Sequence, residues 1–318
     1  MGAKCQLHKV DFPHPPAVLR GMFAAIPFPD ISETIFSLNI GGFELALRWY
    51  ALAYVAGILI ARWLILLVIR RPQLWPGNTP AITPEQFEAL VSWMIIGIIV
   101  GGRLGFVLFY QPAFYLQNPA EIYKVWNGGM SFHGGFLGVI TAGLLFCMKH
   151  KIPVRPFADV IAISAPQGLL LGRLANFING ELWGRETTVP WGVIFPSADA
   201  QNCAQALIGM CARHPSQLYE ALGEGLILGT VLIYMVFRTS ALKRTGLLLG
   251  LFLAGYGTVR FLVELVRQPD YFYQSPTNPV GYALQFGNYG LTMGQILSLP
   301  MIALGLWVLL RAKHDDRA

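Results

Sequence analysis

Long apolar stretches recur along most of this chain, and short polar connections separate them. We predict seven membrane-spanning helices, over residues 49–69, 87–110, 133–149, 157–179, 217–237, 246–266 and 290–311. The first stretch, WYALAYVAGILIARWLILLVI, has close to the roughly 20 residues that a helix needs to cross the hydrocarbon core of a bilayer. The pattern therefore predicts an all-α, polytopic integral membrane protein.

The fourth stretch differs from the others. Pro166, Gln167 and Gly168 interrupt its apolar pattern, and polar residues crowd its end. A broken helix is tolerated at membrane depth only where protein or a cavity covers it. We expect the fourth helix to be broken at this point.

The ends of the chain suggest three regions. Residues 1–48 contain several prolines and no long apolar stretch, which argues against a cleaved signal peptide and favours a periplasmic or interfacial segment with short strand-like structure. Residues 49–311 form the membrane domain, and residues 312–318 form a cytoplasmic tail. Met22 is an alternative start of translation, a choice the sequence leaves open.

Composition supports the membrane class. Of the 318 residues, 54% are apolar and 13% are charged, whereas a soluble domain carries about 25% charged residues. The formal charge of +6 does not point to nucleic acid, because the basic residues flank apolar stretches. They gather in the connections that follow the odd-numbered stretches, so we expect an outside N-terminus and a cytoplasmic C-terminus.

Three arginines lie inside or at the end of apolar stretches: Arg103, Arg173 and Arg260. A cation in the bilayer core costs about 2.5–3.5 kcal/mol on insertion scales, so such a group is normally paired and functional. The planar guanidinium fork favours phosphate and carboxylate. These arginines indicate an anionic lipid headgroup or an anionic solute.

The segment GRLANFINGELWGR, residues 172–185, is the richest in polar groups. Its candidate side chains are Arg173, Asn176, Asn179, Glu181 and Arg185. Arginines provide donors for a phosphate, while amides and carboxylates suit the hydroxyls of a glycerol. The alternative is a salt-bridge and amide network that only stabilises the end of the helix.

The segment SFHGGFLG places His133 at the outer start of the third stretch, where Gly134 and Gly135 allow close approach of the backbone or of a ligand. A histidine can move protons near neutral pH or donate to a phosphate. The alternative is an interfacial or capping histidine beside a helix contact.

The sixth stretch places Tyr256, Arg260 and Glu264 at spacings of four residues, on one helix face. The Arg260 and Glu264 side chains can neutralise each other, which is the structural alternative. Tyr50, in Arg48-Trp49-Tyr50, and Arg103, in a glycine-rich segment, are further candidates near the outer side. Aromatic residues there are also typical membrane-interface anchors.

The cysteines show no metal-ligand spacing, and we predict no metal site and no cofactor. Cys203 and Cys211 share one external loop, where a disulfide and two free thiols are both open possibilities.

Taken together, the motifs RLANFINGELWGR, SFHGGFLG, RWY and GYGTVRFLVE resemble those of bacterial prolipoprotein diacylglyceryl transferase. The resemblance extends from about Met22 to Leu310 and departs from the family in residues 1–21 and 197–212. It implies a seven-span inner-membrane enzyme with its active site toward the periplasm. Such an enzyme transfers diacylglyceryl from phosphatidylglycerol to the lipobox cysteine of a prolipoprotein signal peptide, forming a thioether and releasing glycerol phosphate.

The residue patterns and the resemblance together suggest roles for individual residues. We predict a catalytic set of His133, Arg260, Tyr50 and Glu181, and a substrate-binding set of Arg173, Asn176, Asn179, Gly134, Gly135, Arg103, Tyr256 and Glu264. Arg173 matches the arginine of the family that binds phosphatidylglycerol, and Arg260 matches its second essential arginine. The general base is His133, or Arg260 acting through a neighbour.

Two other functions would also place arginines at membrane depth. An anion transporter would be expected to have internal repeats, each with a broken helix, and the sequence has no duplicated motif. A transferase of phosphoalcohol groups would normally need a carboxylate cluster with a divalent metal. The sequence has no Asp-rich segment of that kind.

Overall fold

The computed structural model describes residues 25–40, 43–203, 211–269, 273–275, 277–287 and 289–314. It divides into two compact units, each described here by itself. Unit 1 comprises residues up to Leu64, Ala162–Thr239 and Leu247–Ala312. Unit 2 comprises Ile65–Ile161, Ser240–Gly246 and the residues after Ala312. The possible start at Met22 lies outside the described residues.

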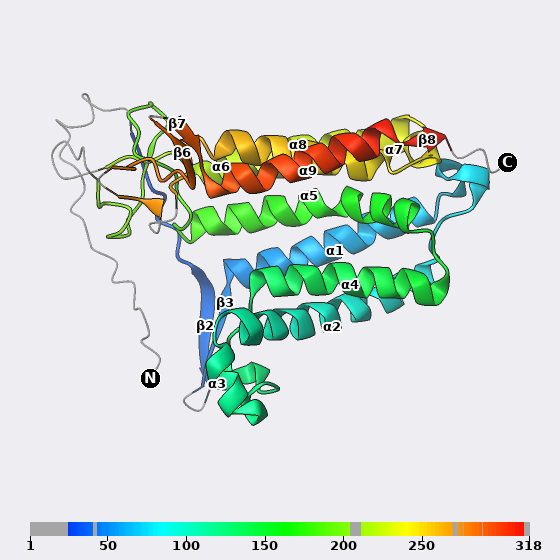
Figure 1. The fold of residues 1–318 in the computed structure, drawn as a ribbon, viewed down its shortest axis with the longest axis horizontal. Coiled ribbons are helices and arrows are strands. Elements are labelled where there is room, and N and C mark those ends of the chain that lie inside the picture. Colours follow the sequence, from blue (N-terminus) through cyan, green and yellow to red (C-terminus); the bar gives the residue numbers. More distant parts are fainter. Residues whose placement is uncertain are drawn as a thin grey trace. The chain divides into compact units, whose positions relative to one another are not determined.

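Unit 2 is built around two helices that pack along each other, α2 (Pro84–Phe109) and α4 (Phe132–His150) (Figure 1). Thr83 begins α2 with a capping box, in which its hydroxyl accepts from the Gln86 N–H and the Gln86 side chain accepts from the Thr83 N–H. The short helix α3 (Pro112–Gln117) follows α2. Glycines line the contact between α2 and α4, so the two backbones approach closely.

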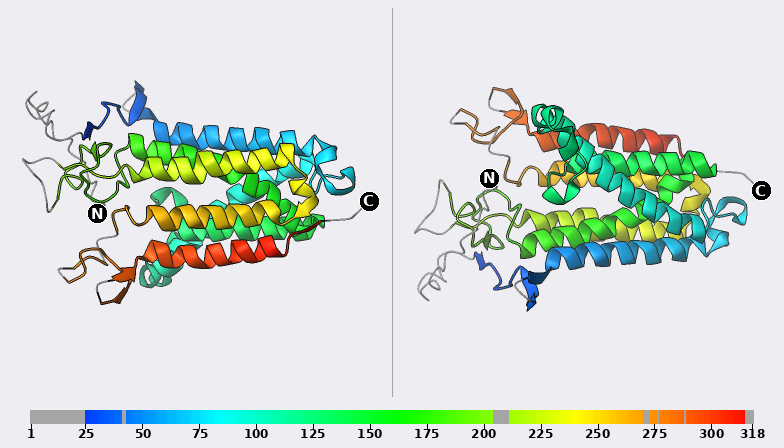
Figure 2. Two further views of the ribbon diagram at one scale, coloured as in Figure 1. Left: turned by 90° about the horizontal axis from the view of Figure 1, so that it is seen from above. Right: turned by 90° about the horizontal axis from the view of Figure 1, so that it is seen from below.

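Most of the helical structure of unit 1 comes from five regions of the chain, of which the first two also extend into unit 2 with residues 65–69 and 154–161. They are α1 (Trp49–Ile69), α5 (Val154–Ile178), the continuous run of α6 (Ser216–Glu220), a π-helical turn (Ala221–Ile227) and α7 (Leu228–Arg238), then α8 (Leu247–Val263) and α9 (Met293–Leu310). Helix α8, drawn in orange, runs beside α9, drawn in red (Figure 2). Their contact is close because Gly250 and Gly257 of α8 face α9.

The fourth predicted helix is not broken, which corrects our expectation. Helix α5 runs without interruption through Pro166. Proline removes one backbone N–H and its ring crowds the preceding turn. The Gln167 side-chain amide, oriented to donate, lies 2.9 Å from the Ile163 carbonyl oxygen and 2.8 Å from that of Ser164. The Gln167 side chain thus donates within the turn around Pro166, although the carbonyl that the missing proline N–H would have reached is that of Ala162.

Short strands connect the helices. Strands β2 (Thr34–Ile40) and β3 (Phe43–Arg48) form an antiparallel ribbon that leads directly into α1 (Figure 1), as expected for the strand-like N-terminal segment. The other pairs are β1 (Ile26–Pro27) with β4 (Val193–Ile194), β5 (Arg244–Thr245) with β8 (Lys313–His314), and β6 (Leu284–Phe286) with β7 (Tyr289–Leu291).

Among the described residues, six helical stretches are long and apolar enough to cross a membrane. They correspond to six of the predicted spans, and the run Ser216–Arg238 counts as one of them. The remaining predicted span, residues 246–266, is the apolar helix α8, which is shorter at 17 residues. The protein is therefore a polytopic, mainly helical membrane protein, while the count of seven spans and the orientation remain predictions.

Candidate active site

Six charged side chains gather in unit 1 and form what we call the arginine–carboxylate cluster: Arg173, Arg260, Arg267, Glu220, Glu224 and Glu264. Glu220 is its centre. Its Oε2 atom lies 3.1 Å from Nε of Arg173, and its Oε1 atom lies 2.9 Å from Nη1 of Arg260. The Nη1 atom of Arg267 lies 3.3 Å from the same Oε1 atom. One carboxylate thus contacts three guanidinium groups.

Local structure explains why these groups meet. Glu220 ends α6, and Glu224 lies in the π-helical turn that follows. Short π-helical segments are rare and are frequent at functional sites. Gly225 and Gly223 allow this turn to approach its neighbours, because an added Cβ would lie 2.6 Å from Cβ of Leu170 in α5 and 2.5 Å from Cγ1 of Val259 in α8. The turn therefore brings both carboxylates to the arginines of α5 and α8.

The cluster is electrically balanced and mostly buried. Three guanidinium groups face three carboxylates, and the Glu220 and Glu224 side chains have no exposed surface. The Arg173 and Arg260 side chains keep 17% and 18% exposure. Burying such charges is costly unless each has a partner. Because the arginines retain some access, they can also bind an incoming oxyanion such as a phosphate.

A second polar group joins α1 to the end of α5. The Asn176 amide donates to the Tyr50 hydroxyl at 2.9 Å and to Oε1 of Glu181 at 2.8 Å. Asn176 is buried, and α5 ends two residues later, before Gly180 with its left-handed φ of 65°. The chain therefore leaves the helix after Ile178 and turns at Gly180. Three predicted site residues from distant segments thus meet in one hydrogen-bond network.

Other predicted residues of unit 1 adjoin these groups. Nη2 of Arg260 lies 2.8 Å from Oε2 of Glu264, as the spacing predicts. The Thr292 hydroxyl, which caps α9, donates to Oε1 of Glu264 at 3.1 Å. Tyr256 interacts electrostatically with Glu224 and with the arginines. Asn179 follows the end of α5 and is half-buried.

The loop after α5 is fixed by Arg213. Its guanidinium group donates to the carbonyl oxygens of Ala200 and Asn202 at 2.5 and 3.0 Å and lies 4.1 Å from the centroid of the Trp183 ring. Burial lowers the pKa of Arg213 and also that of Arg185. The backbone of Arg185 pairs with His214 and Val266, which connects the loop to the end of α8.

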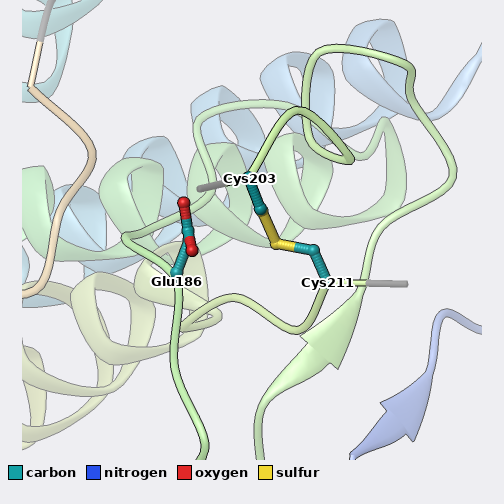
Figure 3. A group of neighbouring side chains, drawn as sticks. All are labelled: Glu186, Cys203 and Cys211. Atoms are coloured by element: carbon teal, nitrogen blue, oxygen red, sulfur yellow. A yellow bond between two sulfur atoms is a disulfide. The ribbon is translucent and has the colours of Figure 1, made fainter. Parts of the chain in front are cut away.

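Cys203 and Cys211 form a disulfide in this loop. Glu186 lies beside them (Figure 3), and its carboxylate is within 4.8 Å of both sulfur atoms. Three such groups could in principle hold a metal ion, but the two sulfur atoms are bonded to each other and are not thiolate ligands. The disulfide, one of the two possibilities left open by the sequence, is the one present.

Unit 2 contains the remaining predicted residues. Gly134 packs against the backbone of Gly101 and Gly105 in α2 and so serves close helix packing, whereas the nearest atom to a Cβ on Gly135 would be 3.6 Å away. His133 itself is exposed on the first turn of α4. Its ring contacts the Phe132 ring edge to face.

Arg103 is almost fully buried in unit 2. It donates to four carbonyl oxygens, those of Ile122 at 2.7 Å, Gly128 at 2.5 Å, Gly129 at 3.1 Å and Glu121 at 2.6 Å. It also lies 5.1 Å from the centroid of the Tyr115 ring. These contacts give Arg103 a structural role in holding the connection between α2 and α4.

Comparison with known proteins identifies the family of this chain. The family model described as prolipoprotein diacylglyceryl transferase matches residues 36–311. The chain belongs to this family. A relative from Ruegeria pomeroyi, named "Phosphatidylglycerol--prolipoprotein diacylglyceryl transferase", is 60% identical over 292 residues, which cover 92% of this chain and 99% of the relative.

More distant relatives carry the same name. One from Caulobacter sp. is 49% identical over 300 residues, covering 91% of this chain and 95% of the relative. One from Rhizobium leguminosarum bv. trifolii is 44% identical over 294 residues, covering 92% and 96%. The family match spans the helices that carry both the arginine–carboxylate cluster and the Tyr50 network.

Sequence reasoning missed the carboxylates at the centre of the cluster. Glu220 and Glu224 lie inside a predicted span, four residues apart, and Gln217 precedes them by one turn. The signal was available, because the argument that singled out buried arginines applies equally to buried carboxylates. Arg267 was placed beyond the sixth span, where its contact with Glu220 could not be foreseen.

Proposed function

We propose that this protein transfers the diacylglyceryl group of phosphatidylglycerol to the cysteine thiol of a prolipoprotein. Membership of the prolipoprotein diacylglyceryl transferase family and the names of close relatives support this function. The structural observation that carries it is the convergence of Arg173 and Arg260 on Glu220, at distances of 3.1 and 2.9 Å. Two guanidinium groups so close together suit a single phosphate group.

The reaction is a substitution at carbon. The cysteine sulfur attacks the glycerol carbon that carries the phosphate ester, and a C–S bond forms as the C–O bond breaks. Glycerol phosphate leaves with the electron pair of the broken C–O bond. The thiol proton passes to a general base. A thiol of pKa about 8.5 attacks as its thiolate, so the reaction needs a proton acceptor. Negative charge grows on the leaving phosphate, and preorganised cations stabilise that charge.

We assign phosphate binding, orientation of the glycerol and acceptance of the thiol proton to different residues. Arg173 and Arg260 bind the phosphate, with Glu264 and Tyr256 positioned beside Arg260. Asn176, Asn179, Glu181 and Tyr50 orient the glycerol portion, which needs amide and carboxylate partners. His133, on its glycine-flanked helix start with Gly134 and Gly135, accepts the thiol proton. For Arg103 we propose a structural role and not the phosphate contact predicted from the sequence, because its guanidinium group already donates to four carbonyl oxygens.

The protein substrate and the location follow from the same resemblance. We propose that the acceptor is the lipobox cysteine of a prolipoprotein signal peptide and that the reaction is the first step of lipoprotein maturation. The enzyme would act in the bacterial inner membrane with its site toward the periplasm. An active site at one end of unit 1 is supported by the polar clusters, to which the start of α1, the last turns of α5 and the end of α6 contribute.

The experiment is transfer of labelled diacylglyceryl from phosphatidylglycerol to a lipobox peptide by the purified protein. Thioether product from wild type, its loss in Arg173→Ala and a strong reduction in His133→Gln would support the assignment. If His133→Gln retained most activity, histidine would not be the base. No product from folded wild type would overturn the transferase function, and anion flux into liposomes would then be measured.

A further inference from the structure

A groove of about 280 Å³ runs between α1 and α5 within unit 1. Small residues form it at intervals of one helical turn, Ala53, Gly57 and Ala61 from α1 and Ser164, Gly168 and Gly172 from α5. Residues four apart lie on the same face of a helix, so each helix turns a strip of small side chains toward the groove. Over the eight residues from Ala53 to Ala61 the strip is about 12 Å long.

The glycines leave space that no protein atom fills. A Cβ atom built on Gly168 or on Gly172 would meet nothing within 4 Å. A Cβ on Gly57 would lie 3.5 Å from Cα of Gly168, which is ordinary contact. All three glycines therefore have room for a Cβ atom, and the closest approach among them is between Gly57 and Gly168. An apolar slot of this kind is suited to a slender apolar ligand and does not hold water well.

The groove has a polar end. Tyr50 and Tyr54 line it, with ring centroids 5.3 Å apart, and the Tyr50 hydroxyl accepts the hydrogen bond from Asn176. Arg173 follows Gly172 directly in the chain and lies one helical turn before Asn176, the partner of Tyr50. A ligand that reaches the arginine–carboxylate cluster with an anion can thus extend an apolar chain along the groove.

We infer that this groove binds one acyl chain of the phospholipid donor. The inference rests on the proposed function, because it takes phosphatidylglycerol as the substrate whose phosphate lies at Arg173. Arg173, next to Gly172 in the chain, keeps 17% exposure while its partner Glu220 has none, so it offers a cation to the headgroup of an anionic lipid. The slot itself suits a single alkyl chain. The helix of a signal peptide is about 10–12 Å in diameter with its side chains and is too wide for it.

The test compares two donors with the same headgroup, dipalmitoyl and dihexanoyl phosphatidylglycerol. Gly168→Leu fills the slot, and we expect the KM for the dipalmitoyl donor to rise about tenfold, the scale of an overpacked apolar site. The KM for the short-chain donor should change by less than about threefold, because a six-carbon chain buries fewer methylenes in the groove. Ala61→Leu, further from the Gly57 contact, should show the same selective effect.

Ala51→Leu is the matched control, since Ala51 lies on α1 and does not line the groove. It should leave the ratio of the two KM values unchanged. If Gly168→Leu and Ala61→Leu reduce activity equally with both donors, or with neither, the groove does not hold the acyl chain. Wild type inactive with both donors would instead refute the transferase function.

Photolabelling of the wild-type protein tests the acyl-chain site without any variant, so it remains informative if a variant fails to fold. Phosphatidylglycerol with a diazirine near the middle of one acyl chain is photolysed with wild-type protein in detergent, and labelled peptides are identified by mass spectrometry. Labels on residues 53–61 and 164–172, removed by excess unlabelled phosphatidylglycerol, would support the site. Labels elsewhere, or labels equally removed by phosphatidylcholine, would overturn it.

Discussion

The Nη1 atom of Arg260 lies 2.9 Å from the Oε1 atom of Glu220, a residue 40 positions earlier in the chain. The other oxygen of Glu220 contacts Arg173, so this one carboxylate determines how close the two arginines are held. Without it, the two cations would repel each other in a poorly solvated site.

Replacing Glu220 by Ala should therefore destabilise the protein strongly. Removing one partner of a buried ion pair costs about 3–5 kcal/mol, and here several guanidinium groups lose their shared anion. We expect a lower Tm in detergent and loss of transfer activity. Glu121→Gln is the control, because Glu121 pairs with Lys124 at a partly exposed site worth about 0–1 kcal/mol. An unchanged Tm in Glu220→Ala would show that the cluster is not coupled as described.

Arg103→Lys separates two roles for this arginine. Lysine keeps the charge but cannot form the fork that satisfies the carbonyl oxygens of Glu121, Ile122, Gly128 and Gly129. Each buried group left without a partner costs about 1–3 kcal/mol. We expect a lower Tm and faster proteolysis within residues 111–130, with KM unchanged in the folded fraction. A higher KM at an unchanged Tm would indicate a substrate contact.

The adjacent glycines after His133 should respond differently to alanine. A Cβ on Gly134 would meet the Gly101 carbonyl oxygen and lie 2.9 Å from Cα of Gly105, while the nearest atom to a Cβ on Gly135 is 3.6 Å away. Gly134→Ala should destabilise by about 1–3 kcal/mol through overpacking. Gly135→Ala should be neutral or slightly stabilising, because alanine favours helix by up to about 1 kcal/mol. Thermal unfolding of both variants measures the difference, and equal Tm values would contradict the close packing of α2 and α4.

The disulfide between Cys203 and Cys211 should stabilise the connection between α5 and α6. Native disulfides typically contribute about 2–4 kcal/mol. Reduction should lower the Tm of wild type to that of a Cys203→Ser/Cys211→Ser variant, which should not respond to reductant. Cys147→Ala, which removes the buried free cysteine, should remain sensitive to reductant. If reductant left the Tm of the wild type unchanged, the disulfide either would not form or would not stabilise the protein.

His214 should make stability depend on pH. Burial lowers the pKa of His214 below its ordinary value of 6.5, and its Nδ1 atom lies 3.1 Å from the Tyr219 hydroxyl. Around pH 6.5 and below, the unfolded chain then binds more protons at this residue than the folded one, so the free energy of unfolding decreases as pH falls. At higher pH the contribution is constant. In His214→Gln the Tm should fall less between pH 7.5 and 5.5 than in wild type, and parallel curves would exclude this residue as the cause.

Much of the fold was readable from local pattern. The apolar stretches located the helices, because a segment that crosses a bilayer must satisfy its own backbone hydrogen bonds and expose apolar side chains to lipid. Residues 49–69 match α1, and the i, i+4 spacing of Arg260 and Glu264 predicted their ion pair. The predicted break at Pro166 was wrong, because one missing backbone N–H did not interrupt α5, which continues through the proline to Ile178.

The candidate site depends more on tertiary structure. The sequence identified Tyr50, Asn176, Arg173 and Arg260 by chemical type, and its motifs identified the family. It could not show that Glu220, which was not among the predicted site residues, forms ion pairs with Arg173 of α5 and Arg260 of α8. Nor could it show that Asn176 joins Tyr50 across 126 residues of chain. Such pairings depend on helix rotation and crossing, which are set by packing between distant segments.

The positions of the helices and the pairing of their side chains thus depend on different physical constraints. The sequence by itself determined the membrane class, the positions of most helices and the inventory of arginines, because desolvation in lipid acts on every residue locally. Only the tertiary structure decided which carboxylate neutralises which arginine and where glycines leave an open groove between α1 and α5. Those outcomes depend on close approach between helices, which the small side chains of Gly223, Gly225 and Gly57 permit.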